Sequence, residues 1–515
     1  PIEGALDKCE VSFEHHMAIT RIYESPRVTK PYTDEQWQDI DALGSKVDGD
    51  LLKGDVRLTM GGEPTFVSVE DRDGAEWNTD ALGPTKRGLA TELVHKLRKR
   101  YGDGGFLHFG QGKWYPGEQL PRWALSIFWR ADGQPCWHDP SLFADERNSV
   151  RYTSEDAKLF IDTLANKLGV GTAHIQTGYE DTFYYMWRER RLPINVDPFD
   201  ARLDDELERV RMRRIFDQGL THQVGFALPL KREWSVGLSG PKWVTGPWFF
   251  RDERMYLFPG DSPMGYRLPL DSLPWVSKGE YPFMHEHDPF APRGALPAAA
   301  TYRSQYGSHQ VGGGMAQGGA VGVQGQAVSG LGGSGVNGEW GALGPNPTAG
   351  VVGPETTSKT DPNKLPNRFE SANWITRSAL CVEVRNPDRA SGPKVETEGQ
   401  GGGVMYVFMP PLNVLDDYLD LLTAVEATAL DLGMSIVLEG YPPPRDPRLK
   451  MLQVTPDPGV IEVNIHPASS WEQLVDHTEF LYQAAHETRL SPEKFMVDGR
   501  AIGTPSAARR SDAVA

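Results

Sequence analysis

Cysteine is scarce in this sequence, which has three cysteines, Cys9, Cys136 and Cys381, among 515 residues. They lie far apart, without a CxxC spacing or an even count, and this argues against a disulfide framework or a structural zinc site. Long apolar runs are also absent, because no stretch approaches the roughly 20 residues that a membrane-spanning helix requires. The sequence therefore predicts a reduced, cytoplasmic protein without a membrane span.

An excess of basic residues is absent as well. The chain has 53 Lys and Arg residues against 70 Asp and Glu residues, a formal net charge of -17 and a pI near 5.3. Such a balance provides no general attraction to nucleic acid or to anionic lipid, so neither is expected as a partner. A mass of 57.1 kDa is too large for one ordinary core and suits an enzyme.

Helical and strand patterns are both present, as in an α+β protein. Residues 307–353 are Gly-rich and almost uncharged, which predicts a flexible tether. Ser154 is the candidate N-cap of one of the helices. Amphipathic spacing predicts helices over 34–46, 84–105, 154–171, 204–219 and 415–433. Strand patterns occur over 56–60, 105–118, 375–386, 403–412, 435–444 and 459–467, with further short strands between 220 and 280.

Three polar side chains alternate with apolar ones in strand 459–467. Glu462, Asn464 and His466 fall on one face of this strand, because side chains alternate between the two faces. A polar triplet on a strand with an apolar back must meet solvent, a ligand or other polar groups. This pattern favours a functional role for the three residues.

Carboxylates fall on two other expected strands. Glu383 shares a face with Arg385, an arrangement that suits a structural ion pair as well as a site. Glu63 follows a pair of glycines after strand 56–60, where the glycines suit either an approaching ligand or a bulge. Glu63, Glu383 and Glu462 together are compatible with a hard-metal site, and oxygen ligands favour magnesium or manganese over zinc.

Two loops carry basic residues that suit an anion. Lys113 lies in "HFGQGKWYPGE", where it could meet a phosphate as a point charge, although the GxxxxGK[ST] pattern of a Walker loop is absent. Arg445 lies in the proline-stiffened "LEGYPPPRDPRL", which could clamp an anion or form internal salt bridges. Neither loop alone identifies a ligand.

Two other chemistries remain open from the residues alone. Cys381 shares the face of Glu383, and Cys136 has His138 and Asp139 close by, so a cysteine nucleophile is a rival reading. A glycosidase could also use paired carboxylates together with the 14 tryptophans. No GxSxG elbow of a serine hydrolase is present.

Several long motifs together resemble the bacterial amidoligase domain that follows a transglutaminase-like domain in large proteins. They cover nearly the whole chain outside the Gly-rich segment. The resemblance implies a glutamine-synthetase-like, or carboxylate–amine ligase, fold in which a curved antiparallel sheet holds ATP and divalent metals. The motifs are "RVTKPYTDEQW", "DVRLTMGGEPTFVS", "EWNTDALGPTKR", "LHFGQGKWYPGEQLPRWAL", "PGDSPMGYRLPLDSLPW", "SALCVEVR", "LEGYPPPRDPRL" and "VTPDPGVIEVNIHPASSW".

The resemblance also implies a site and a reaction. Glu63 resembles the first-strand metal glutamate of such ligases, and Glu462 a metal or substrate carboxylate on a later strand, with Glu383 as the third metal candidate. ATP would phosphorylate a peptide or amino-acid carboxylate, and an amine would attack the acyl phosphate. The catalytic candidates are Lys113, Arg385 and His466, and the nucleotide-binding candidates are Lys113, Arg385, Arg445 and Asn464.

The resemblance further predicts how the chain is organised. We expect an extension over 1–50 that remains from a linker to an upstream transglutaminase-like domain, and an amidoligase-like domain in two parts, 51–305 and 369–504. A disordered insert over 306–368 and a disordered tail over 505–515 complete the chain. The family continues after "FMVDGRAIGT" into a Gly-rich strand with an Asn-His pair, whereas this chain reads "PSAARRSDAVA". The first hypothesis is therefore an ATP-dependent amide ligase, and the second a catalytically incomplete module that binds a partner or supports a transglutaminase-like domain.

Overall fold

The structure of the protein is a computed structural model. None of the helices that it describes combines the length and the apolar character that crossing a lipid bilayer demands. The residues that it describes are 33–57, 61–83, 85–113, 122–145, 151–190, 221–233, 241–252, 254–259, 266–285, 288, 292–306, 361, 363–385, 403–495 and 501–503.

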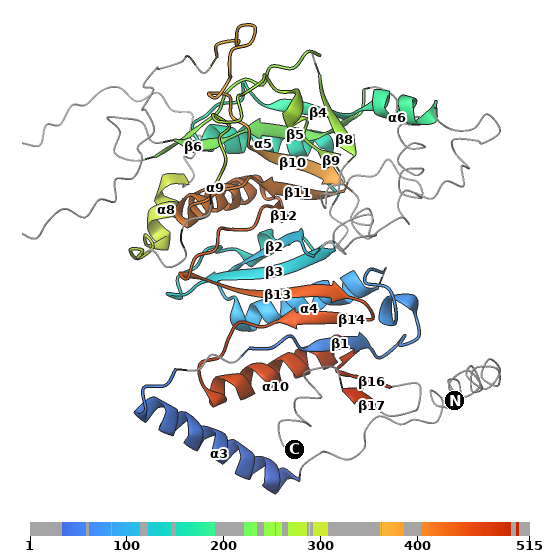
Figure 1. Ribbon diagram of the computed structural model, residues 1–515, viewed down its shortest axis with the longest axis vertical. Helices are drawn as coiled ribbons and strands as arrows, with labels where there is room; N and C mark the ends of the chain where they lie inside the picture. Colours follow the sequence, from blue (N-terminus) through green and yellow to red (C-terminus); the bar gives the residue numbers. More distant parts are fainter. Residues whose placement is uncertain are drawn as a thin grey trace, which may run out of the picture.

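A 13-stranded, mostly antiparallel sheet runs the length of the molecule (Figure 1). Its strands in spatial order are β15, β1, β14, β13, β3, β2, β12, β11, β10, β5, β4, β8 and β9. Parallel pairing occurs between β11 and β12, between β12 and β2, and between β4 and β8. The bounds of these strands are Thr65–Ser68 (β1), Phe106–Gln111 (β2), Trp123–Arg130 (β3), Gln176–Glu180 (β4), Gln223–Pro229 (β5), Met255–Pro259 (β8), Tyr266–Arg267 (β9), Ala379–Arg385 (β10), Val404–Met409 (β11), Ile436–Gly440 (β12), Leu449–Asp457 (β13), Val460–Asn464 (β14) and Leu490–Ser491 (β15).

Strands from the two sides of residues 307–360 alternate within this sheet. Strands β10 to β15 follow that segment in the chain, and β1 to β9 precede it. The pairs β15–β1, β1–β14, β13–β3, β2–β12 and β10–β5 each join one strand from each side. Two further hairpins, β6 with β7 (Lys231–Glu233, Lys242–Val244) and β16 with β17 (Glu493–Phe495, Ala501–Gly503), lie outside the large sheet.

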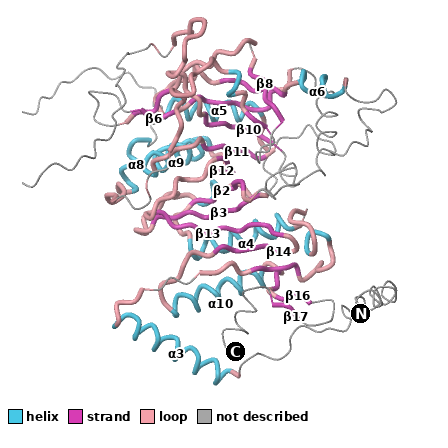
Figure 2. The backbone as a smooth tube through the Cα atoms, viewed as in Figure 1, coloured by secondary structure: helices cyan, strands magenta, loops and turns pink. Residues whose placement is uncertain are grey.

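Helices flank the sheet, as Figure 2 shows by colour. Helix α9 ends at Gly433, whose φ of 63° would strain any residue with a β-carbon. One hydrophobic core continues between these helices and the central strands, and a second, smaller core packs Trp248, Leu273 and Ile375 against residues of β5, β8 and β10. The described helices are α3 (Asp34–Lys53), α4 (Lys86–Tyr101), α5 (Ser154–Lys167), α6 (Thr182–Glu189), α8 (Ala299–Tyr306), α9 (Leu415–Leu432) and α10 (Trp471–Glu487), with the short 3-10 turns Ala75–Trp77, Pro140–Leu142 and Leu270–Ser272.

The helices α4 and α9 cover opposite faces of the sheet. On β2 the ring of Phe106 stacks on Tyr418 of α9, with 6.0 Å between ring centroids. Arg87 of α4 lies 5.7 Å from the ring centroid of Phe109. Positions 106 and 109 differ by three residues and therefore project from opposite faces of the strand. Near β10 to β12, α9 therefore covers the face on which Phe106 lies and leaves the face on which Phe109 lies uncovered.

The sequence predictions for the fold are confirmed at the level of an α+β protein with a large antiparallel sheet and flanking helices. The helices expected over 34–46, 84–105, 154–171 and 415–433 are α3, α4, α5 and α9. The cap of α5 is Thr153, whose hydroxyl accepts a hydrogen bond from the Asp156 amide, and the Ser154 prediction was wrong. The helix predicted over 204–219 and the tether over 307–353 lie outside the described residues.

The strand predicted over 56–60 is not where the sequence pattern put it. Val56 and Arg57 follow the C-cap of α3 without strand structure, and residues 58–60 lie outside the described residues. The strand begins later, at Thr65, so Glu63 precedes β1. Pro64 separates the glutamate from the strand, because a proline can begin a strand but cannot donate to a central ladder.

Candidate functional site

A cavity of about 710 Å³ opens over the β4–β12 part of the sheet. Its lining includes residues of β10, β5, β4 and β8 and the ends of β11, β12 and β2. Apolar residues supply much of the wall, and the charged lining residues are Asp271, Arg377 and Glu383. A cavity of this size with an apolar wall and a few polar groups has the properties of a small-molecule site.

The cavity lies on the face that α5 and α9 leave uncovered. Leu380 and Val382 of β10 belong to the core that packs against these helices, whereas Cys381 and Glu383 alternate with them and line the cavity. Glu439 of β12 pairs with Phe109, which faces α4, so Glu439 points to this same uncovered side. The strand alternation thus places two carboxylates under the cavity.

Glycines make room beside Glu383. Gly178 on β4 pairs with Gly225 on β5, and Gly225 pairs with Glu383 on β10. Paired residues project from the same face, so two of these three positions carry no side chain. A β-carbon added to Gly225 would stand 2.8 Å from the β-carbon of Glu383, a distance at which one of them has to move. The position of Glu383 therefore depends on glycine at 225.

Glu383, which lines the cavity, belongs to a buried group of three charges. Arg385 donates a hydrogen bond to Glu383 at 2.5 Å and a second one to Glu439, and its guanidinium lies 3.6 Å from the ring centroid of Tyr406. Burial lowers the pKa of Arg385, but the charges of Glu439 and Glu383 outweigh burial and raise it above its usual value. The guanidinium is therefore permanently charged. We call Glu383, Arg385 and Glu439 the floor triad.

Four of the predicted residues meet elsewhere, around β14. Thr65 of β1 pairs with Glu462, and the Pro64 and Gly62 carbonyls accept hydrogen bonds from the Val463 and Ile465 amides. This ladder places Glu63 opposite Asn464 on the face that carries Glu462. Lys113 completes the group, with its ammonium 3.9 Å from a Glu462 oxygen. We call Glu63, Lys113, Glu462 and Asn464 the β14 polar cluster.

The surroundings of Glu462 in the β14 polar cluster disfavour the charged form of its carboxyl group. Burial raises the pKa of the Glu462 carboxyl, the charges of Asp457 and Glu63 raise it further, and Lys113 opposes them. The Thr455 hydroxyl donates a 3.5 Å hydrogen bond to Glu462 and accepts one from Asn464 at 3.3 Å. Since carboxylates that repel one another are stabilised by a cation between them, the cluster suits a positively charged ligand.

The structure does not bring Glu383 to Glu63 and Glu462. Going from β10 to β14 crosses β11, β12, β2, β3 and β13, which is six strand steps. At about 4.8 Å per step this is roughly 29 Å along the sheet. Within the described ranges, no group of three or more His, Cys, Asp or Glu side chains could hold a metal ion. The predicted residues therefore form two separate groups.

His466 lies apart from the two polar residues that precede it in the chain. Strand β14 ends at Asn464. The His466 ring packs edge-on against Trp129 and against Tyr101 of α4, and it lies tilted to His477 of α10 with 4.4 Å between ring centroids. The prediction that Glu462, Asn464 and His466 share one face is thus wrong for His466. The alternation ceases where the strand ends, and the apolar rings of α4 and α10 attract the imidazole.

Acidification is expected to destabilise the protein through this ring cluster. Burial, His477 and Lys450 lower the pKa of His466 from 6.5 to about 4. Between these pH values the unfolded chain takes up a proton that folded His466 does not, so stability falls as the pH drops through this window. His466→Phe keeps a ring but cannot be protonated, and its Tm should fall less between pH 6.5 and 4. Equal losses of Tm in both proteins would show that His466 does not contribute.

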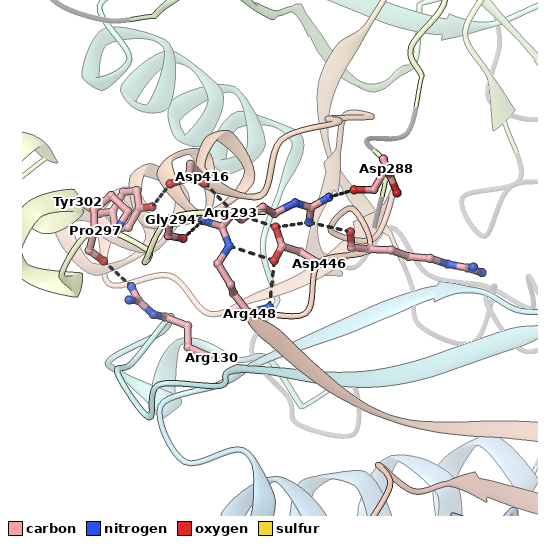
Figure 3. Close-up of polar contacts among 10 residues, drawn as sticks. Arg130, Asp288, Arg293, Gly294, Pro297, Tyr302, Asp416, Asp446 and Arg448 are labelled. Atoms are coloured by element: carbon pink, nitrogen blue, oxygen red, sulfur yellow. Dashed lines mark hydrogen bonds and ion pairs between the residues drawn. The ribbon is translucent and has the colours of Figure 1, made fainter. Parts of the chain in front are cut away.

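The loop that carries Arg445 is part of an internal ion network (Figure 3). The Asp446 carboxylate accepts hydrogen bonds from Arg448 at 2.8 Å and lies 2.7 Å from a nitrogen of Arg293. Burial raises the pKa of Asp446, but the hydrogen bonds and charge of Arg448 and the charge of Arg293 keep it below its usual value. Arg445 itself is exposed, and its carbonyl accepts a hydrogen bond from Arg293. Of the two alternatives for this loop, an anion clamp or internal salt bridges, the contacts show internal salt bridges.

The same network ties the segment before α8 to the sheet and to α9. Arg448 also binds Asp416 of α9 at 3.0 Å and donates to the Gly294 carbonyl at 3.0 Å. Arg130 of β3 donates to the Pro297 carbonyl at 2.8 Å, as Figure 3 shows. These contacts fix residues 292–306 in place, which is a structural role.

The geometry disfavours cysteine chemistry at the two described thiols. Burial raises the pKa of Cys136 to about 12, and burial with the charge of Glu383 raises that of Cys381 to about 12. The reactive thiolate is therefore scarce at neutral pH. The Nδ1 atom of His138 forms a 3.1 Å hydrogen bond with Glu426 of α9 and not with a cysteine sulfur. Cys9 lies outside the described residues.

Sequence reasoning assigned no role to several residues that shape these sites. Glu439 lies on strand 435–444, where its alternation with the apolar Leu438 was a usable signal. Arg377, which lines the cavity, and Arg122, which pairs with Asp457 beside the β14 polar cluster, carry no such signal. Their positions follow from strand pairings between distant segments.

The cavity on one face of the large, mostly antiparallel sheet combines an apolar wall with a few charged residues, as small-molecule sites do. The chain belongs to the family described as "Putative amidoligase enzyme (DUF2126)", whose model matches residues 7–508. This membership supports a ligase-type function in broad terms. No curated protein and no solved structure matches the chain.

Proposed function

We propose that this protein is an ATP-dependent carboxylate–amine ligase that joins a peptide or amino-acid carboxylate to an amine through an acyl phosphate. Membership of the amidoligase family supports the reaction class. The observation that carries the proposal is the 710 Å³ cavity, which ends at Gln111 and Gly112. The next residue, Lys113, contacts the β14 polar cluster. The end of β2 thus lies between a substrate-sized cavity and a cluster that suits cations and phosphate, which by strand pairing project from opposite faces of the sheet.

The β14 polar cluster is the part of the molecule that fits a nucleotide with magnesium. Mg²⁺ is held in such enzymes by one or two carboxylates together with substrate phosphates, so Glu63 and Glu462 suffice as protein ligands. Lys113 is 60 % exposed at its side chain, which leaves the ammonium able to reach a phosphate. Bound Mg·ATP would supply the phosphoryl group and offset its charge. The floor triad is a poor phosphate site, because it holds two carboxylates against one guanidinium.

The wider context belongs to the same proposal. We infer a glutamine-synthetase-like arrangement for the sheet and an upstream transglutaminase-like domain as the setting in which the ligase works. Manganese could replace magnesium, since both prefer oxygen ligands. A cytoplasmic location agrees with the scarcity of cysteine and with the need for ATP.

Mg·ATP is expected to raise the Tm of the protein, because a ligand that binds only the folded state stabilises it. Glu462→Gln removes a charge but little volume, so the rise in Tm on adding Mg·ATP should shrink to less than about half, while the far-UV circular dichroism spectrum stays unchanged. The matched control is Glu479→Gln, because Glu479 is exposed on α10 and its variant should respond like the wild type. An unchanged rise in Tm with Glu462→Gln would remove Glu462 from the nucleotide site.

A further inference from the structure

Arg377 brings a positive charge to the wall of the cavity. It lies two residues before β10, and its guanidinium donates a hydrogen bond to the Pro274 carbonyl and lies 5.8 Å from the ring centroid of Tyr281. Among the described residues, its buried Nε atom has no hydrogen-bond partner, and no carboxylate forms an ion pair with the guanidinium. Burial lowers the pKa of Arg377 below its usual value, so the surroundings penalise this charge. An anion bound in the cavity would offset that penalty.

The two acidic residues of the wall do not neutralise Arg377. Glu383 binds Arg385, and it follows Ala379, the first residue of β10, by four positions or roughly 13 Å at about 3.3 Å per residue. Asp271 is exposed to solvent, and its charge only opposes the effect of burial on the pKa of Arg377. The end of the cavity at Arg377 therefore favours an anion.

The wall next to Arg377 is apolar. Ala379 and Cys381 continue the cavity face of β10, and Phe408 of β11 pairs with Cys381 and lines the cavity beside it. Tyr281 lines the cavity as well and is 38 % exposed, so an aromatic ring lies at the opening beside the guanidinium. A ligand that fits this end therefore carries its anionic group directly beside an apolar one.

Charge and length narrow the class of ligand. The acidic residues of the wall would repel a phosphate dianion, whereas a carboxylate carries a single charge that one guanidinium neutralises and can hold through two parallel hydrogen bonds. From Arg377 the cavity crosses β11 and β12 to Gln111 at the end of β2, three strand steps or roughly 14 Å at about 4.8 Å per step. About four extended residues of a peptide cover this length, at about 3.3 Å each.

We propose that the cavity binds the C-terminal end of a peptide whose last residue is apolar, with its carboxylate at Arg377, its last side chain against Ala379 and Phe408, and its backbone leading toward Gln111. The role of this peptide as the ligase substrate rests on the proposed function, whereas its binding does not. A hydrogen bond to a charged group in a poorly solvated site is strong enough for the peptide acid to bind about tenfold or more tightly than its C-terminal amide.

The test is isothermal titration of the full chain without nucleotide. The probes are acetyl-alanyl-alanyl-phenylalanine, the C-terminal amide of this tripeptide, and phenylpropionate as a free carboxylate of similar end group. We expect the acid to bind at least about tenfold more tightly than the amide, and more tightly than phenylpropionate. Arg377→Gln should remove most of the difference between acid and amide. Equal affinities of acid and amide, or a preference for the acid that persists in Arg377→Gln, would overturn the proposal, and phenylpropionate binding as tightly as the acid would overturn the peptide as the ligand.

A second variant keeps the test independent of the fold of Arg377→Gln. Asp271→Asn removes the negative charge nearest the proposed carboxylate, so the acid should bind about two- to fivefold more tightly while the amide binds as before. The control of equal charge is Glu479→Gln, because Glu479 is exposed on α10 and does not line the cavity, and it should bind both probes like the wild type. Unchanged or weaker binding of the acid by Asp271→Asn would contradict the site. Binding of the acid without any effect of Mg·ATP on Tm would support the cavity assignment and refute the ligase proposal alone.

Discussion

Replacing Arg385 by methionine should lower the free energy of unfolding by about 3–5 kcal/mol, because removing one member of a buried ion group leaves uncompensated charge. The variant keeps Glu383 and Glu439 beneath the cavity, where their side chains are 4 % and 1 % exposed. It also removes the guanidinium from the face of Tyr406. Urea denaturation followed by tryptophan fluorescence measures the change, provided that the slope of the transition stays constant.

A triple variant separates charge from packing in this experiment. Arg385→Met combined with Glu383→Gln and Glu439→Gln has no charge left in the floor triad, so much of the lost stability should return. Arg445→Met is the matched single control, because Arg445 is exposed and its change should cost less than about 0.5 kcal/mol. A loss below about 1 kcal/mol for Arg385→Met would show that the triad behaves like a surface ion pair.

Cutting the chain between residues 307 and 353 should leave one folded particle, whereas neither half should fold alone. The large sheet joins the two halves through five strand pairs, so separating them would expose the edges of β1, β2, β3 and β5 on one side and of β10, β12, β13, β14 and β15 on the other. Unpaired strand edges and the shared core make the isolated halves unstable. The measurement is native size-exclusion chromatography after cleavage at a protease site inserted in that range.

The control for the cleavage is a protease site inserted between residues 234 and 240, which connect β6 to β7. Both strands belong to the first half of the chain, so this cut does not separate the two halves. That cut should also leave the particle intact, and its Tm should exceed or equal that of the first cut. Two separate peaks, each with its own cooperative melting transition, would mean that 51–305 and 369–504 are independent domains.

The local elements of this fold could be predicted from the sequence because their signals are local. Helix α9 has apolar spacing over its whole length and a glycine stop at Gly433, and α4 repeats Leu89, Leu93 and Leu97 on one side. Helix α10 was missed, although Ser470 caps it and Glu472 lies in its first turn. Leu481, Ala484 and Ala485 recur on one side of α10 and belong to the main core, so the apolar spacing was a usable signal for this helix.

The site could be predicted only in part, because strand order is a non-local property. Alternation correctly put Glu462 beside Asn464 and Glu383 beside Arg385, since both pairs lie within one strand. No local pattern shows that β10 and β14 are six steps apart, or that Glu439 completes the floor triad. For residues beyond the end of a strand, such as His466, the alternation of side chains between the two faces no longer applies.

The most direct test of the ligase proposal is to trap the acyl phosphate with hydroxylamine. The full chain is incubated with Mg·ATP, hydroxylamine and a mixture of glutamate-containing peptides, and the products are analysed by mass spectrometry. The proposal predicts peptide hydroxamates that require ATP, form together with ADP and are lost in the Glu462→Gln variant. Absence of both ADP and hydroxamate, in a preparation whose Tm is unaffected by Mg·ATP, would contradict it.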